Sequence, residues 1–310
     1  MVETKLAAVL AAMREKKMNP LAPYRIWLMV GGGAMSGAYG AGAVMALVDA
    51  GFGEVFDGGI GVSTGAPTLG YFLAARANNP PGKNLYQTTV YCEEACSRGF
   101  FRPRLRLDVA WLTEVFRGST GKPIEWERVQ EHPSRYVIVV TDWETGIPRY
   151  IEPENRDDMF MAIHGACSIP LMAPPVRLRG DLVTDSSVSE PMPIEWLMQL
   201  PAMTRPTHVL VIANTWREPP SVKKQQLERL LVSGALRHRA PRTIRSNMHK
   251  RFTRFHEAVQ ASLGRTDVVV GVDWLPWPAK SLDRNATRLR RLTEVGYDRW
   301  LTLTKKPREP

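Results

Sequence analysis

The chain has 310 residues, 44% of them apolar, and a formal net charge of +10. That length and apolar content are enough for a sizeable buried core. The longest apolar runs have the length of strands and charges interrupt residues 1–18, so we expect neither a transmembrane helix nor a signal peptide. Cys92, Cys96 and Cys167 have neither a metal-site spacing nor that of a secreted disulfide framework, which favours a reduced, cytoplasmic environment.

Helix-like and strand-like segments alternate along the chain. The helix-like segments are residues 2–17, 37–50, 63–77, 85–98, 108–117, 157–167 and about 281–304. The strand-like segments are residues 24–30, 136–142, 207–214 and 268–272. Unbroken apolarity, as in residues 24–30, is typical of a strand buried on both faces. The alternation predicts an α/β fold with a largely parallel sheet.

Two glycine-rich turns follow apolar strands, thirty residues apart. The first is Gly31–Gly37, and the second is Gly61–Gly65 with the pattern Gly-x-Ser-x-Gly around Ser63. That pattern alone is weak, because glycine and serine cluster in ordinary turns. Between a strand and a helix it indicates a nucleophile elbow, in which a serine oxygen sits on a sharp bend. Main-chain N–H groups of the first turn could then hold an oxyanion.

Nucleotide binding is the rival interpretation of the first turn. A dinucleotide fingerprint that starts at Gly31 would need a third glycine where Ser36 stands. A phosphate loop of the Walker type needs a lysine, and none occurs between Lys17 and Lys83. A structural alternative is tight helix–sheet packing, which suits Gly40 and Gly42 further along the helix.

A serine nucleophile needs a base. None of the six histidines has a convincing position, and only His164 is held in reserve. Asp185 follows the strand-like residues 181–184 and precedes small side chains, so it could approach another loop closely. It could equally be a turn aspartate that binds its own backbone.

Three blocks together resemble the patatin-like phospholipase family. They are the glycine loop with its helix (residues 31–43), the serine turn (61–66) and a long segment that ends in Asp185 and the prolines after it (166–193). The resemblance extends over about residues 24–215 and implies a three-layer α/β sandwich with a largely parallel central sheet. It implies a catalytic dyad of Ser63 and Asp185, and an oxyanion hole formed by the amides of Gly32, Gly33 and Ala34. It also implies hydrolysis of fatty-acyl esters of phospholipids and neutral lipids, with no metal or other cofactor.

The sequence departs from the family pattern at two places. Met35 stands where the family usually carries arginine or lysine, and Ser186–Ser187 follow the aspartate in place of glycines. If that turn needs a positive φ, serine has a steric cost that glycine avoids. These departures keep an alternative open, a catalytically weak lipid-binding protein on the same fold. An aspartate with an ordinary pKa of about 4 is a weak base at neutral pH, so we expect burial to raise the pKa of Asp185.

The organisation we predict has three parts. They are an N-terminal helix (1–22), a patatin-like catalytic core (23–220) and a basic, mainly helical C-terminal part packed on the core (221–310). Residues 221–255 hold ten lysines and arginines against one acid, Glu228. This segment could contact an anionic membrane peripherally, bind nucleic acid or form a solvated helix face. For a protein that acts on lipids we favour the membrane contact over nucleic acid.

Overall fold

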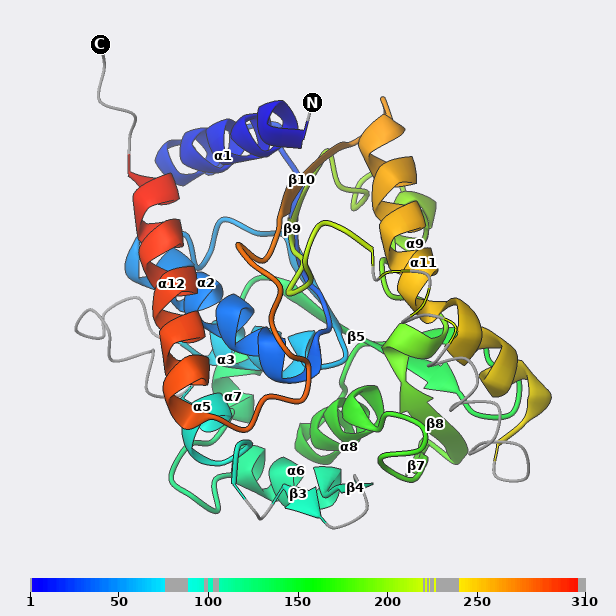
Figure 1. Ribbon diagram of the computed structural model, residues 1–310. Coiled ribbons are helices and arrows are strands. Elements are labelled where there is room, and N and C mark those ends of the chain that lie inside the picture. Colours follow the sequence, from blue (N-terminus) through cyan, green and yellow to red (C-terminus); the bar gives the residue numbers. More distant parts are fainter. Residues whose placement is uncertain are drawn as a thin grey trace.

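The computed structural model describes residues 2–75, 89–97, 100–102, 106–219 and 240–305, together with the single residues 221, 223 and 226. An eight-stranded sheet lies between two layers of helices (Figure 1). Its strands are β1 (Ile26–Val30), β2 (Gly58–Val62), β5 (Arg135–Asp142), β6 (Pro148–Ile151), β7 (Val176–Leu178), β8 (Asp181–Asp185), β9 (His208–Ile212) and β10 (Val269–Asp273). A separate two-stranded ribbon pairs β3 (Phe101–Arg102) with β4 (Arg106–Leu107).

Most of the helices expected from the sequence are present, while the helices at Trp126–Glu131 and Ile194–Gln199 were not expected. The helices are α1 (Val2–Met18), α2 (Gly37–Asp49), α3 (Gly65–Ala74), α5 (Val90–Glu93), α6 (Val109–Arg117), α7 (Trp126–Glu131), α8 (Arg156–Cys167), α9 (Ile194–Gln199), α11 (Arg242–Gly264) and α12 (Ala286–Thr304), with short 3-10 turns η1 (Ala34–Ser36) and η3 (Ser186–Val188). The helix predicted over 85–98 is the exception, because α5 is a single turn; residues 85–88 and 98 lie outside the described part. No helix among the described residues is long and apolar enough to cross a membrane.

The sheet is parallel over most of its width. Its order is β10-β9-β1-β2-β5-β8-β7, and the first five strands run parallel, so the largely parallel sheet is confirmed. The remaining strands are antiparallel: β6 and β8 each pair with β5, and β7 pairs with β8. The carboxyl ends of β1, β2 and β9 therefore lie along one edge, where parallel α/β sheets bind ligands.

Alternate residues of the strands face two separate cores. In β1, Ile26, Leu28 and Val30 pack with the helices α1, α2, α3, α8 and α12. Trp27 and Met29 face the opposite core, which α9 and α11 cover. Because both faces of the sheet are covered, the central strand β1 is buried and apolar along its whole length, as its unbroken apolar run predicted. The three-layer α/β sandwich is confirmed.

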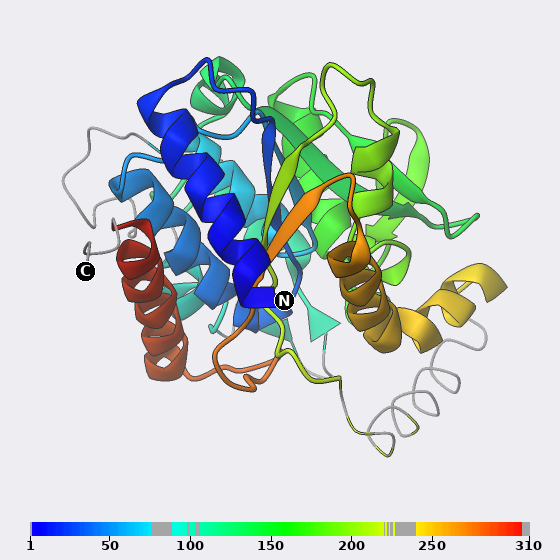
Figure 2. The ribbon, with the colours of Figure 1, turned by 90° about the horizontal axis from the view of Figure 1, so that it is seen from above.

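The C-terminal elements belong to these layers. β10 adds an edge strand next to β9, and α12 lies along α2 (Figure 2). The buried carboxylate of Asp273, at the end of β10, accepts hydrogen bonds from Tyr39 of α2 (2.6 Å) and from Trp300 of α12 (2.8 Å). Arg299 donates to the same carboxylate at 2.9 Å. These bonds connect α2, α12 and the edge of the sheet, while the boundaries of the three predicted parts stay predictions.

Candidate active site

Ser63 lies on the sharp turn between β2 and α3. Its φ is +52°, a left-handed conformation that serine adopts rarely and that is typical of strained functional turns. The turn also needs glycine at position 65, because a Cβ there would lie 1.9 Å from the carbonyl oxygen of Val30 in the neighbouring strand. The Gly-x-Ser-x-Gly pattern therefore has the strand–turn–helix setting that a nucleophile elbow requires.

Strand register brings Asp185 to Ser63. Val62, the last residue of β2, pairs with Val139 of β5, and the next residue of β5, Val140, pairs with Asp185. Asp185 thus lies just past the end of β2, where the chain turns into Ser63. The Ser63 hydroxyl donates to Asp185 Oδ2 at 2.7 Å, and the aspartate side chain is completely buried.

The two serines after Asp185 take part in this contact. Ser186 Oγ accepts a hydrogen bond from the amide of Ser63 at 2.7 Å, and Ser187 donates to Asp185 Oδ1 from its amide (2.8 Å) and its hydroxyl. Both serines form the 3-10 turn η3, and neither has a positive φ. The steric cost considered for serine in place of glycine therefore does not arise, and the aspartate is held by side chains that glycine lacks.

The glycine loop lies against Ser63. A Cβ on Gly32 would be 2.9 Å from the Cβ of Ser63, so only glycine allows this approach. Among the described residues, the amides of Gly32, Gly33 and Ala34 have no hydrogen-bond acceptor. Ala34 has a φ of +49°. The loop therefore carries unpaired donors next to the serine, as an oxyanion site requires.

Asn214, which the sequence analysis missed, holds this loop in place. It follows β9 with a φ of +51°, and its side chain donates to the Gly31 carbonyl and accepts from the Gly40 amide, both at 2.8 Å. The Ser36 hydroxyl lies 2.7 Å from the carbonyl oxygen of Gly33 and 2.9 Å from that of Asn214. The signal in the sequence is that Asn tolerates a positive φ, but the predicted strand 207–214 included Asn214. Its distant partners could not be read from the sequence.

Arg254 of α11 reaches the turn that carries Asp185. Its Nη1 donates to the carbonyl oxygens of Val188 and Ser189, each at 2.8 Å, and its Nη2 donates to Asn247 Oδ1 at 3.2 Å. Glu190 follows in the same segment, and its burial raises its pKa to about 7 although Arg254 opposes the shift. Helix α11 therefore supports the turn that follows Asp185.

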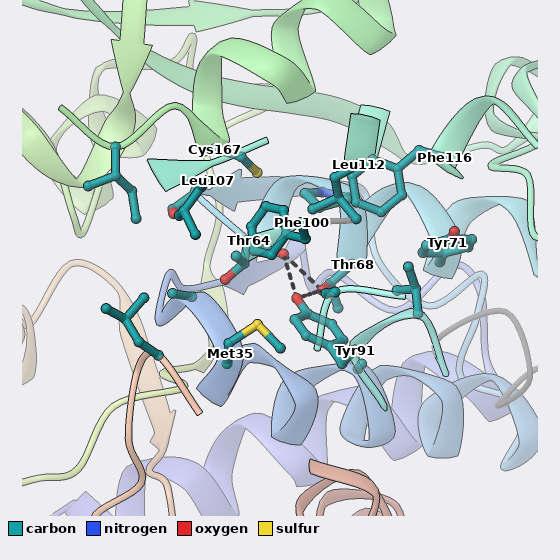
Figure 3. A pocket seen from close by; sticks show the side chains of 18 residues that line it. Met35, Thr64, Thr68, Tyr71, Tyr91, Phe100, Leu107, Leu112, Phe116 and Cys167 are labelled. Carbon is teal, nitrogen blue, oxygen red and sulfur yellow. Dashed lines mark hydrogen bonds between the residues drawn. The ribbon is translucent and has the colours of Figure 1, made fainter. Parts of the chain in front are cut away.

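An apolar channel opens onto Ser63. Figure 3 shows its walls, with Met35, Tyr91 and Phe116 among the labelled side chains. The cavity volume of the channel is about 40 Å³, and both Ala34 and Ser63 line it. Tyr71 and Phe116 also line it and pack edge to face, with ring centroids 6.1 Å apart. The Met35 side chain lines it too, while the Met35 amide donates to the carbonyl of Ser281 at 3.0 Å. The channel thus presents hydrocarbon next to the serine and the loop amides.

The Tyr91 hydroxyl is one of the few polar groups in the channel wall. It lies 3.2 Å from the Thr68 hydroxyl and donates to the carbonyl of Thr64 at 3.3 Å (Figure 3). Burial raises the pKa of Tyr91 to about 12. The hydroxyl is therefore protonated and paired at neutral pH, so it adds no charge to the channel.

His164, the reserve base, lies elsewhere. It lines a separate groove, and burial lowers the pKa of its imidazole. The partner of the Ser63 hydroxyl is Asp185. Within the described ranges, no three His, Cys, Asp or Glu side chains gather as metal ligands would. Much of the basic segment 221–255 lies outside the described residues; within α11, Arg242 and Lys250 are exposed.

Fold and site define an α/β protein with a serine–aspartate contact at the carboxyl edge of its sheet. A family model described as patatin-like phospholipase matches residues 28–198, more than half of the chain. The chain therefore belongs to the patatin-like phospholipase family, as the sequence blocks predicted. A comparison with curated proteins gave no match. Among solved structures, the crystal structure of VipD from Legionella pneumophila is similar, at 11% identity and a TM-score of 0.39, with 91% of this chain and 67% of that chain covered.

Proposed function

We propose that the chain is a serine acyl hydrolase that cleaves fatty-acyl esters of lipids or phospholipids. The observation that carries the proposal is the 2.7 Å hydrogen bond from Ser63 to the buried Asp185. Two further features support it, the apolar channel that opens onto Ser63 and the free amides of the adjacent loop. Membership of the family supports a lipid ester as the substrate.

The reaction proceeds in two halves. Ser63 Oγ attacks the ester carbonyl carbon while Asp185 takes the hydroxyl proton. The amides of Gly32, Gly33 and Ala34 stabilise the negative charge on the carbonyl oxygen, at about 3 kcal/mol for each well-placed donor. The alcohol leaves with the proton from Asp185, and the acyl group remains on Ser63. Water then attacks this ester with Asp185 again as base, which releases the fatty acid and restores the serine.

Hydrolysis of p-nitrophenyl acyl esters and of mixed phospholipid vesicles tests the proposal. Ser63→Ala and Asp185→Asn are each expected to lower kcat by about 10⁴-fold or more. Matched controls are Ser119→Ala and Asp157→Asn, two exposed positions on the surface. Circular dichroism checks that each variant is folded. Activity that survives Asp185→Asn would mean that the base is another group.

The alternative is a catalytically weak lipid-binding protein on the same fold. It rests on Met35, which replaces a cation of the family pattern. Because the Met35 side chain lines the channel, we expect it to contact the acyl chain. A fluorophosphonate probe separates the two functions, since an acyl hydrolase reacts at Ser63 while the alternative protein is labelled poorly.

We also propose a peripheral contact with anionic membranes through the basic segment 221–255. Exposed cations on α11, such as Arg242 and Lys250, support it, at about 1 kcal/mol for each cation near a charged surface. Sedimentation with vesicles should show binding that increases with anionic lipid and decreases with salt. Equal binding to neutral and anionic vesicles would contradict the contact.

A further inference from the structure

A second, wider groove lies beside the channel. Its walls come from β4, the start of α6, His164 of α8 and the loop 171–176 before β7. Its cavity volume is about 690 Å³. Nothing in the reaction proposed for Ser63 uses this groove.

One segment of chain joins the groove to the dyad. The carbonyl of Ser168 accepts a hydrogen bond from the Asp185 amide at 3.1 Å. The next residue, Ile169, lines the channel, and Leu171 lines the groove. Three residues of chain span at most about 11 Å, so the groove begins within a short distance of the dyad. Leu107 lines both cavities, and its amide donates to the Met172 carbonyl at 2.8 Å, so the two cavities share a wall.

The charged groups that line the groove are matched among the residues that the structure describes. The Arg102 guanidinium donates twice to Asp108 Oδ2, at 2.7 and 3.1 Å, so its charge is matched. Burial opposes ionisation of Asp108, but hydrogen bonds from the Trp111 amide and Arg102 outweigh it and hold the pKa of the carboxyl below its ordinary value. Burial lowers the pKa of His164, so this imidazole is mainly neutral at pH 7. A phosphate would find no unmatched cation among these groups.

Leu171 gives the groove an exposed apolar surface. Its φ of +80° is a conformation that leucine adopts rarely, and 38% of the residue is exposed. Strained backbone of this kind is more common at functional sites than elsewhere. Together with the matched charges, this favours a hydrocarbon occupant over a phosphate.

We propose that the groove binds the second hydrocarbon chain of a two-chain lipid, while the channel holds the chain whose ester is cleaved. The inference rests on the proposed function and names its substrate class. A diacyl lipid has two chains that diverge from neighbouring carbons, and the shared wall at Leu107 separates the apolar channel from the groove in the same way. The protein should therefore prefer two-chain lipids to their single-chain counterparts.

Calorimetric binding of ether lipids tests this preference without turnover. The probes are a phosphocholine lipid with two hexyl ether chains, its counterpart with one hexyl ether chain, and glycerophosphocholine, which has no chains. We expect the wild type to bind the two-chain lipid at least about tenfold more tightly than the single-chain lipid. Equal affinity for the two lipids would overturn the proposal, and so would effective competition by glycerophosphocholine, which would assign the groove to a headgroup.

Two variants target the groove by different means. Ala110→Trp fills it from an exposed position on α6, and Leu171→Asn makes it polar with a residue that tolerates positive φ. Each should lower the affinity for the two-chain lipid about tenfold and leave that for the single-chain lipid unchanged. Ala202→Trp and Leu21→Asn, at exposed sites elsewhere, are the matched controls. Equal weakening of both lipids would exclude a site for a second chain.

The outcome is independent of catalysis. Ether lipids lack the ester bond, so their binding reports on the groove whether or not Ser63 hydrolyses esters. Hydrolysis of p-nitrophenyl butyrate, which has a single short chain, reports on the dyad alone. If the wild type does not hydrolyse p-nitrophenyl butyrate, the proposed function is refuted, while the preference for two-chain ether lipids can still be measured.

Discussion

Replacing Asn214 by alanine is expected to destabilise the protein by about 3–7 kcal/mol. The side chain makes two buried hydrogen bonds, to the Gly31 carbonyl and from the Gly40 amide, each 2.8 Å long. Removing it leaves two buried groups unpaired, at about 1–3 kcal/mol each. Alanine must also adopt the φ of +51°, which costs about 1 kcal/mol more. The sum is a large fraction of the usual stability of a domain.

The same change should slow the reaction, because Asn214 positions the loop that presents the oxyanion amides. The expected result is a lower kcat on p-nitrophenyl esters with little change in KM, since the channel itself is unaltered. Asn214→Gly separates the two causes of instability: it loses the same hydrogen bonds without the strain, so it should be about 1 kcal/mol more stable than Asn214→Ala. Asn19→Ala, on an exposed loop, is the control.

Urea denaturation measures the stability, and steady-state kinetics on the folded fraction measures kcat. If Asn214→Ala unfolds within 1 kcal/mol of the wild type and keeps full turnover, the amide side chain does not hold the loop. A stability loss without any change in kcat would mean that Asn214 supports α2 alone. The prediction that joins the loop to catalysis would then be wrong.

Three further changes test the packing around the site. Gly42→Ala should destabilise the protein by at least about 3 kcal/mol in urea denaturation, because its Cβ would lie 1.9 Å from the Thr293 carbonyl oxygen. The control Gly53→Ala, whose Cβ would meet only open space, should change the stability by no more than about 1 kcal/mol. Glu190→Gln should stabilise the protein by about 3 kcal/mol above pH 7, because burial raises the pKa of Glu190 to about 7 and the carboxyl costs stability as it ionises. This gain in stability should shrink towards pH 5, and a gain independent of pH would contradict the reasoning. Arg254→Met should lower kcat more than it raises KM, because the carbonyls of η3 lose their donor, and unchanged kinetics would exclude a positioning role.

The parts of the fold that follow from local patterns were predicted from the sequence. Apolar runs predicted the parallel strands β1, β5, β9 and β10, and the turn at Ser63 lies between a strand and a helix, as its Gly-x-Ser-x-Gly pattern indicated. The short antiparallel strands β6 and β7 carry no such run, so they were not expected. Helix–sheet packing was the interpretation considered for Gly42, but this residue contacts α12. A glycine in a helix indicates that another element packs closely against it, and the sequence does not show which element that is.

The contacts within the site depend on distances that the sequence does not contain. Asp185 alone could be a turn aspartate or a base, and only its pairing opposite Val140 brings it to the end of β2. Its serine neighbours would have had a steric cost only if the turn needed a positive φ, and the sequence does not show the backbone conformation of that turn. In a 3-10 turn the same hydroxyls become partners of Ser63 and Asp185. A substitution in a motif is therefore informative only once the backbone conformation at that position is known.

The site also depends on elements beyond residues 28–198, which the family model matches. β9 pairs with β1 on the side opposite to β2. The carbonyl of its last residue, Ile212, accepts a hydrogen bond from the Gly31 amide at 2.8 Å. Asn214, two residues further on, holds the glycine loop, while Arg254 of α11 holds the turn after Asp185. The serine and the aspartate thus come from the matched region, but the glycine loop beside Ser63 and the turn after Asp185 are held by later residues. The geometry proposed for catalysis is consequently a property of the whole sandwich and not of the motif-bearing segment alone.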